Sequence, residues 1–175
     1  CKLDYEEVIK GADLILQVTP SKFTRNIVRQ YAKYVDVKKQ PIIVCSKGIE
    51  KETTLTLDEV ILQEIPNARI GALSGPSHAE EVSIAIPTVL VVDEKVKNLV
   101  QDVFMNEYMR LYTSNDVKGV ELGGALKNII AFCSGVAAGI GFGDNTFAAL
   151  ITRGLVEIRK LGIALGGKEE TFYGL

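Results

Sequence analysis

Several residue patterns that mark particular classes of protein are missing from this sequence. It has 20 basic and 22 acidic residues, with no dense basic run, so we expect no nucleic-acid partner. Its three cysteines, Cys1, Cys45 and Cys133, are odd in number and widely spaced, which predicts neither a disulfide framework nor a metal site. This cysteine usage favours a reducing cytoplasm, and we expect a cytoplasmic protein without a bound metal.

Long hydrophobic runs are scarce as well. The longest nearly apolar run, residues 129–142, is interrupted by glycines and is shorter than the roughly 20 residues that cross a membrane. We interpret it as a buried helix and expect no membrane span. No signal peptide is recognisable, and the chain opens on Cys1, so we expect an interior piece of a longer protein.

What is present is a series of apolar runs that alternate with helical patterns. Apolar residues make up 47% of the chain and charged residues 24%, as in ordinary globular proteins. Strands are expected over residues 13–18, 41–45, 69–73, 88–92 and 109–113. Helices are expected over residues 4–10, 22–34, with Ser21 as its cap, 55–64, 78–83 and 94–104. Continuous apolar strands are typical of a mostly parallel, doubly wound α/β sheet that is covered on both faces.

The helical pattern takes over from about Asp116 onward. We therefore predict two domains, residues 1–115 and 116–175, with an abrupt change between them, because no linker rich in proline or serine separates them. Residues 141–144 (GFGD) are expected to break the helical part. Asp144 would then cap a second helix over residues 145–165.

The segment 121–128 (ELGGALKN) places a lysine among small residues. One face of the predicted helix carries Val120, Gly123, Gly124, Lys127 and Ala131. Each of the two glycines costs about 1 kcal/mol relative to alanine inside a helix, so we expect another backbone or a ligand to approach closely there. A buried Lys127 would have a lowered pKa. The alternative is a side chain that extends along the helix surface into solvent.

Small polar loops follow the first three predicted strands, at residues 19–21, 46–48 and 74–77. Ligands of open α/β sheets bind at the carboxyl ends of the strands. Lys47 follows a strand on a short, flexible platform and could reach an anion, although a solvated loop lysine fits the same pattern. Gly75 and Ser77 could present backbone N–H groups and a hydroxyl to an anion at a helix N-terminus. Simple N-capping by Ser77 fits equally well.

Three other motifs are interpreted as structural. His78 is the single histidine and has no nucleophile and acid beside it in the sequence, so we expect a surface or capping residue. Glu80 and Glu81 are interpreted as first-turn charges that the helix dipole favours. The glycines at 139, 141 and 143 imitate a dinucleotide-binding fingerprint only superficially, since they follow a helical pattern and the third required glycine is missing.

Four segments taken together resemble the bacterial NAD(P)-dependent glycerol-3-phosphate dehydrogenases. They are SKGIE (46–50), LSGPSHAEE (73–81), YTSNDVKGVELGGALKNIIA (112–131) and GFGDNTFAALITRGL (141–155). The resemblance covers essentially the whole chain. It implies the second part of a Rossmann-type dinucleotide-binding domain, followed by the first helices of an all-α substrate domain. The glycine-rich first unit would precede Cys1. An arginine-asparagine motif for the substrate phosphate would follow Leu175.

The resemblance also implies an activity. Members of this family interconvert dihydroxyacetone phosphate and sn-glycerol 3-phosphate by hydride transfer with NAD or NADP, a step that supplies glycerophospholipid precursors. Lys127 matches the catalytic acid/base. Substrate contacts would come from Lys47, Gly75, Ser77, Lys127 and Asn128, and cofactor contacts from Lys47, Ala79 and Phe23. The full-length protein is expected to be a homodimer, and this chain alone is expected to be inactive.

Two alternatives stay open. The β-hydroxyacid dehydrogenases of the 6-phosphogluconate type share the general layout and a lysine-asparagine pair, although SKGIE and GPSHAEE argue against them. A non-catalytic binding or assembly module is the other. The choice between NAD and NADP would depend on residues before Cys1. Within the site, a second ammonium at Lys47 would disfavour the charged form of Lys127 and adjust it for proton transfer.

Overall fold

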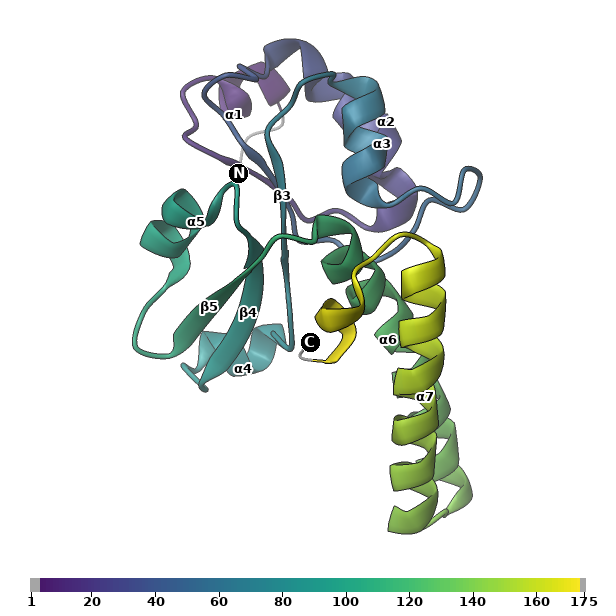
Figure 1. The fold of residues 1–175 in the computed structure, drawn as a ribbon. Helices are drawn as coiled ribbons and strands as arrows, with labels where there is room; N and C mark the ends of the chain where they lie inside the picture. Colours follow the sequence, from purple (N-terminus) through teal and green to yellow (C-terminus); the bar gives the residue numbers. More distant parts are fainter. Residues whose placement is uncertain (1–3, 174–175) are drawn as a thin grey trace.

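The computed structural model describes residues 4–173, which form one five-stranded sheet with helices around it (Figure 1). The strands lie side by side in chain order: β1 (Ile15–Gln17), β2 (Ile42–Val44), β3 (Ile70–Ser74), β4 (Thr88–Asp93) and β5 (Met109–Ser114). All the predicted strands are confirmed, each within two residues at either end. Cys1, one of the three cysteines predicted to form neither a disulfide nor a metal site, lies outside the described residues.

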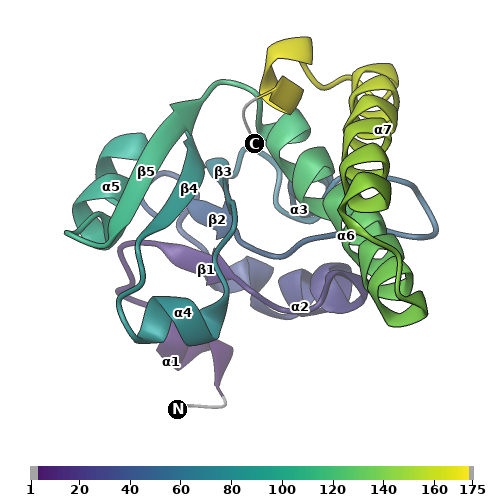
Figure 2. The same ribbon diagram turned by 90° about the horizontal axis from the view of Figure 1, so that it is seen from below.

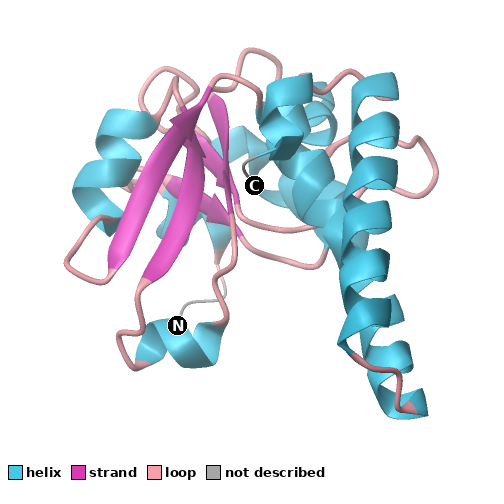
Figure 3. Ribbon diagram, turned by 60° about the horizontal axis from the view of Figure 1, so that its bottom comes forward, coloured by secondary structure: helices cyan, strands magenta, loops and turns pink. Residues whose placement is uncertain are grey.

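The sheet is parallel except at one pairing. Strands β1, β2 and β3 run parallel, β4 runs antiparallel to β3, and β5 runs parallel to β4. A parallel crossover needs a dozen or more residues, usually with a helix that packs on the sheet. Between β3 and β4 the chain forms only the five-residue helix α4 (Ala79–Ser83), which lies beyond the strand ends, so the chain returns antiparallel (Figure 3).

Both faces of the sheet are covered, as the continuous apolar strands predicted. Ile42 and Val44 point into a core with α2 (Thr24–Tyr31) and α3 (Leu57–Glu64). Ile43, between them, points to the opposite face, where a second core includes Val100 of α5 (Lys97–Phe104). Alternate residues of a strand face opposite sides of the sheet. Helix α5 and the later helix α6 accordingly lie on opposite sides of β4 and β5 (Figure 2).

The remaining elements are helical. A short helix, α1 (Tyr5–Ile9), precedes the sheet, and 3-10 turns η1 (Ser21–Phe23) and η2 (Ala32–Tyr34) flank α2. After β5 come α6 (Val117–Ile140), α7 (Asp144–Ala164) and the 3-10 turn η3 (Glu169–Tyr173). The Asp116 carboxylate caps α6 by accepting from the Gly119 N–H at 2.9 Å, and it also accepts from the Thr171 hydroxyl at 2.6 Å. One buried side chain therefore fixes η3 beside the start of α6.

Two predicted helix caps are wrong. Ser21 does not cap a helix: it opens the turn η1, and α2 has no side-chain cap. Its side chain instead fills the space beside Gly48, where a β-carbon on Gly48 would lie 2.5 Å from the Ser21 Oγ. Asp144 is the first residue of α7, and Gly143 is the N-cap. The Asp144 carboxylate still lies in the first turn, where the helix dipole favours a negative charge. The predicted break is confirmed by Gly141, a left-handed C-cap with φ +89°.

The prediction that residues 129–142 form a buried helix is wrong as well. They form the outer part of α6, where Phe132 is 73% exposed and Ile140 is 67% exposed. Among the described elements only α7 packs along this part, and the two helices extend away from the sheet as a hairpin (Figure 1). The apolar pattern correctly predicts a helix, but whether that helix is buried depends on which other elements pack against it.

Helix α6 meets a length and composition criterion for crossing a membrane, with mean hydropathy 1.3. Core helices of soluble proteins meet the same criterion. Three charged residues lie in its first half, Lys118, Glu121 and Lys127, and each contacts another element of the chain. The absence of a membrane span stays a prediction.

Candidate active site

Lys127 lies where α6 crosses the carboxyl end of β3. Its Nζ donates a hydrogen bond to the carbonyl oxygen of Gly75 at 3.2 Å. The Ser77 hydroxyl is 3.5 Å from the same oxygen. The lysine side chain is therefore directed at the loop after the strand, and it does not extend along the helix surface into solvent.

Glycine at position 124 allows this close approach. A β-carbon there would lie 2.8 Å from the Ser74 Oγ and 3.7 Å from the Lys47 Cγ. A close approach is therefore found at Gly124, but the approaching atoms belong to side chains and not to another backbone. Gly75 has φ +157°, a conformation that side chains rarely adopt, and a β-carbon on it would lie 2.6 Å from the Val89 carbonyl oxygen. Gly75 thus lies against the main chain of β4, and Gly124 lies against the side chains of Ser74 and Lys47.

A cavity of about 200 Å³ opens beside Lys127. Its polar side is formed by the loop after β3 and by α6, and its apolar side by β4, α7 and η3. It is lined by Ser74, Gly75, Pro76, Val89, Val91, Val120, Gly123, Gly124, Lys127, Leu155, Ile158 and Phe172. Because pockets for drug-sized ligands measure about 300–1,000 Å³, this one suits a small molecule.

The surroundings of Lys127 lower its pKa, which favours proton transfer at neutral pH. Burial lowers the pKa of Lys127 from its ordinary value, and the nearby Lys47 ammonium lowers that pKa further. A lysine with a lowered pKa can exchange a proton with a substrate oxygen at neutral pH. Cys45, two residues before Lys47, is not a candidate nucleophile, because burial raises the pKa of its thiol to about 11.

The loops after β1 and β2 hold Lys47 in place. The Ser46 hydroxyl donates to the carbonyl oxygens of Thr19 at 2.5 Å and Gln17 at 3.0 Å. These bonds join the two strand ends, and Gly48 closes against Ser21 on the other side of the lysine. The position of Lys47 at the carboxyl end of β2 therefore follows from the contacts of its two chain neighbours, Ser46 and Gly48.

The predicted site residues divide into two groups. Lys47, Gly75 and Ser77 follow β2 and β3 as predicted, and Lys127 of α6 joins them at the carboxyl ends of these strands. Asn128 does not join them: it is exposed and does not line the cavity. Successive helix residues point about 100° apart, so a lysine that faces the cavity turns its neighbour away from it.

The two predicted cofactor contacts outside this cluster lie at the surface. Phe23 follows β1, is 45% exposed, and has the Lys22 ammonium 4.7 Å from its ring centroid. Ala79 is the exposed first residue of α4. The roles predicted for these residues stay predictions.

The structure also decides between the interpretations of the loop after β3. His78 is exposed and its Nδ1 is 2.7 Å from the Glu80 carboxylate, so the surface interpretation is confirmed. The N-cap residue of α4 is His78, and no side chain caps that helix. N-capping by Ser77 is therefore wrong, and its hydroxyl stays beside the Gly75 carbonyl.

Sequence reasoning missed the apolar wall of the cavity. Val89 and Val91 lie on β4, and Phe172 comes from η3, far along the chain. Phe172 and Tyr173 are aromatic residues after a polar stretch, and that contrast is the one available signal. Its position depends on the Asp116 contacts that fix η3, which no local pattern indicates.

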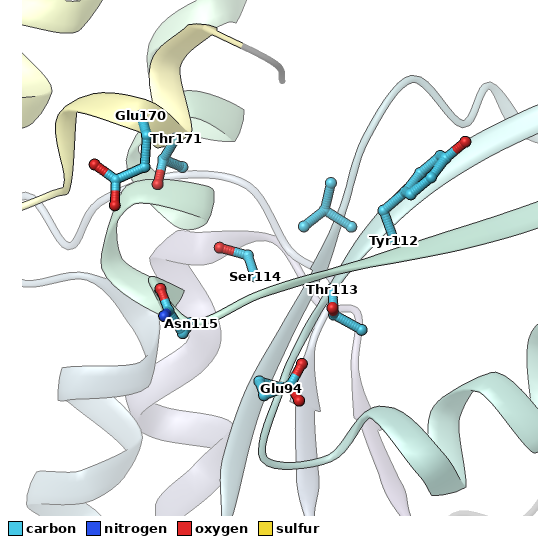
Figure 4. A pocket seen from close by; sticks show the side chains of 8 residues that line it. Glu94, Tyr112, Thr113, Ser114, Asn115, Glu170 and Thr171 are labelled. Carbon is cyan, nitrogen blue, oxygen red and sulfur yellow. The ribbon is translucent and has the colours of Figure 1, made fainter.

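A larger, polar cavity of about 660 Å³ lies between the last two strands and η3 (Figure 4). It is lined by Val91, Glu94, Tyr112, Thr113, Ser114, Asn115, Glu170 and Thr171. Its charged lining residues are carboxylates, and neither Lys47 nor Lys127 lines it. The smaller cavity is therefore the better candidate for an anionic substrate.

Comparisons with known proteins agree with this geometry. Residues 1–100 match the family described as NAD-dependent glycerol-3-phosphate dehydrogenase N-terminus, and residues 116–175 match its C-terminus. The chain is 51% identical over 176 residues to a glycerol-3-phosphate dehydrogenase [NAD(P)+] of Agathobacter rectalis, and 51% identical over 178 residues to one of Staphylococcus haemolyticus. Each match covers 98% of this chain.

The fold is shared with a solved structure. The crystal structure of glycerol-3-phosphate dehydrogenase from Coxiella burnetii superimposes with a TM-score of 0.92 at 34% identity, over 99% of this chain and 54% of that one. The two curated relatives are covered over 52% and 53% of their lengths. The chain thus spans about half the length of the relatives that it matches.

Proposed function

The chain belongs to the NAD-dependent glycerol-3-phosphate dehydrogenase family, and we propose that its full-length protein interconverts dihydroxyacetone phosphate and sn-glycerol 3-phosphate with NAD or NADP. The resemblance found in the sequence is thereby confirmed at the level of the family. The observation that carries the proposal is the Lys127 ammonium, which lies with a lowered pKa in a small cavity beside a strand end.

In this proposal Lys127 is the acid/base. Its Nζ protonates the C2 oxygen of dihydroxyacetone phosphate as a hydride reaches C2, and it removes the hydroxyl proton in the reverse direction. Gly75 and Ser77 position the substrate, and Lys47 contributes positive charge toward the phosphorylated substrate and the cofactor. The apolar wall of Val89, Val91 and Phe172 excludes water, which strengthens these interactions.

The cofactor supplies the hydride, and the residues of this chain fit one part of it. The exposed ring of Phe23, the small side chain of Ala79 and the Lys47 loop all follow strand ends, where ligands of open α/β sheets bind, and they would hold the nicotinamide end of the cofactor. The described residues contain no strand followed by a glycine-rich fingerprint for the pyrophosphate. The chain therefore fits the reactive end of the cofactor.

Four further points belong to the proposal. The chain alone is inactive or nearly so, which its coverage of about half of each relative supports. Its two domains divide at residues 115 and 116, which the Asp116 cap and the two family matches support. The full-length protein works in the cytoplasm, where it supplies glycerophospholipid precursors. It forms a homodimer, a prediction that no contact among the described residues tests.

The test is an assay of the full-length protein. We expect oxidation of NADH or NADPH that depends on dihydroxyacetone phosphate, and no turnover of NADP with 6-phosphogluconate. Turnover with 6-phosphogluconate would instead identify a β-hydroxyacid dehydrogenase of that type. A folded protein that turns over neither substrate would support the binding or assembly module. The 175-residue chain, assayed in parallel, should show no turnover.

A further inference from the structure

Glu121 is a buried acid that the proposed reaction does not use. It lies on α6, six residues before Lys127, and is 6% exposed. Its Oε2 accepts a hydrogen bond from the backbone N–H of Asp58 at 3.3 Å, in the first turn of α3. Its Oε1 is buried without a hydrogen-bond partner among the described residues. A buried carboxylate with an unsatisfied oxygen is costly, so this side chain needs an explanation.

Within residues 4–173, no lysine or arginine donates a hydrogen bond to the buried Oε1 of Glu121. On α3 the nearby acids are Asp58, which accepts from the Thr56 hydroxyl at 2.5 Å, and Glu59. Lys118, one turn earlier on α6, donates to Glu59 at 2.7 Å. Further charges line the cavity beside Asp58: Arg69, Asp93, Lys95, Asp116 and Lys118. Glu121 therefore lies next to a second carboxylate, with the nearest lysine of its own helix paired elsewhere.

Three contacts follow one another along α6 at intervals of three residues. Glu121 meets the start of α3, Gly124 meets Ser74 at the end of β3, and Lys127 meets the Gly75 carbonyl. Residues three apart are neighbours on a helix surface, and six residues rise about 9 Å along the axis. A rotation or tilt of α6 at Glu121 would therefore displace the Lys127 Nζ from the cavity.

We propose that Glu121 is a positioning residue that acts as a neutral carboxylic acid, holding α6 against α3 so that Lys127 stays at the Gly75 carbonyl. The proposal rests on the proposed function, in which Lys127 transfers the proton. A protonated Glu121 can donate a hydrogen bond to the Asp58 carboxylate while it accepts one from the Asp58 N–H. The two side chains then share one negative charge and do not repel each other. Ionised, Glu121 would place two negative charges side by side in the buried interface between α3 and α6.

The electrostatics support a neutral form. Burial raises the pKa of Glu121 well above its ordinary value, and the Asp58 carboxylate raises that pKa further. The backbone N–H groups of Asp58 and Leu57 oppose this shift as smaller causes. The folded chain therefore keeps a proton that the unfolded chain releases above the ordinary value of 4.5. As the pH rises above 4.5, this group lowers the stability of the folded state.

The test compares two substitutions in the full-length enzyme. Glu121→Gln keeps the size and the neutral state, so we expect kcat within about threefold of the original enzyme, by the preorganisation argument. Glu121→Ala removes the contact, and we expect kcat to fall by about 10- to 100-fold, as for a displacement near 1 Å, with a smaller change in KM. The kinetic pKa assigned to Lys127 should rise in Glu121→Ala, because a displaced lysine is better solvated. Glu157→Gln, on the exposed face of α7, is the matched control.

Stability against pH gives a second readout that needs no activity. Glu121→Gln should unfold at a higher temperature than the original protein at neutral and alkaline pH, and the difference should vanish near pH 4. If Glu121→Ala does not fold, Glu121→Gln still decides the neutral-acid claim.

Three results would overturn the proposal. They are a Glu121→Ala enzyme with the original kcat and pH profile, a Glu121→Gln enzyme as impaired as Glu121→Ala, and a Glu121→Gln protein that is less stable than the original at high pH. A full-length enzyme that does not turn over dihydroxyacetone phosphate would overturn the proposed function instead, and the stability comparison would still test whether Glu121 is neutral.

Discussion

The two halves of α6 differ sharply in burial although both are apolar. In the first ten residues, the buried positions are Gly119, Val120, Glu121, Leu122, Gly124 and Leu126. In the remaining residues, Ala137 alone is buried among those described, while Ile129 is 58% exposed and Val136 is 46% exposed. The inner half packs against the end of the sheet, α3, η3 and Ile158 of α7, whereas the outer half lies along α7 away from the sheet (Figure 1).

Lys127 lies at the boundary between these halves. On one side the helix is closely packed, which lowers the pKa of the lysine through burial. The cavity through which a ligand can reach the ammonium lies over the inner half, where Val120, Gly123 and Gly124 line it. The difference teaches that the closely packed half of a helix can combine a rigid support with an accessible reactive group, because small residues leave space on one of its faces.

Removing the boundary lysine is expected to have the largest effect. In the full-length enzyme, Lys127→Met should lower kcat by about 100- to 10,000-fold, the usual contribution of a general acid or base, while circular dichroism stays unchanged. Lys118→Met is the matched control, a lysine on the same helix that pairs with Glu59 and does not line the cavity beside Lys127. Equal losses in the two variants would contradict the assignment.

Truncating one large side chain in each half tests the difference in packing. Leu122→Ala should lower the free energy of unfolding of this chain by about 2–5 kcal/mol, because Leu122 is 1% exposed in a core with Ile158 and Phe172. Phe132→Ala should change it by about 0.5 kcal/mol or less, as for exposed sites. Urea unfolding measures both. A large cost at Phe132 would show that the outer half is covered in solution.

Glycine-to-alanine substitutions compare the halves on a finer scale. At Gly139 a β-carbon meets nothing within 4 Å, so Gly139→Ala should stabilise the chain by about 0.5–1 kcal/mol through helix propensity. At Gly124 it would lie 2.8 Å from the Ser74 Oγ, and overpacking costs about 1–3 kcal/mol. Gly124→Ala should therefore be the less stable variant in thermal unfolding. The opposite order would mean that the contact with β3 is loose.

The smallest expected effect concerns Lys47. Its ammonium is the second cause, after burial, of the lowered pKa of Lys127. Lys47→Met removes a like charge, so the kinetic pKa assigned to Lys127 should rise, while the larger effect of burial stays. The pH dependence of kcat in the full-length enzyme measures this shift. An unchanged profile would reject the coupling between the two lysines.

The sheet could be predicted because its strands are continuous apolar runs that strand-end loops interrupt. The antiparallel direction of β4 could not be predicted, because it depends on where the short helix α4 lies. The same limit applies to residues 129–142: periodicity indicated a helix, but burial depends on elements elsewhere in the chain. Local chemistry shows what a segment forms, and only the tertiary structure shows what covers it.

The candidate site was predictable to a similar degree. Lys47 and Gly75 follow neighbouring parallel strands, and such strand ends meet at one edge of a sheet. Lys127 was indicated by the glycines on its helix face. Phe172 and the acid pair of Glu121 and Asp58 could not be found, because both are created by contacts between segments far apart in the sequence.

The central claim, that Lys127 transfers the proton, is tested most directly by chemical rescue of a Lys127→Ala full-length enzyme with small alkylammonium ions. We predict that its rate of dihydroxyacetone phosphate reduction rises with ammonium concentration and varies with the pKa of the amine, while a Lys118→Ala enzyme shows no such response. A Lys127→Ala enzyme that keeps the original rate, or one that no amine restores although it folds and binds substrate, would contradict the claim.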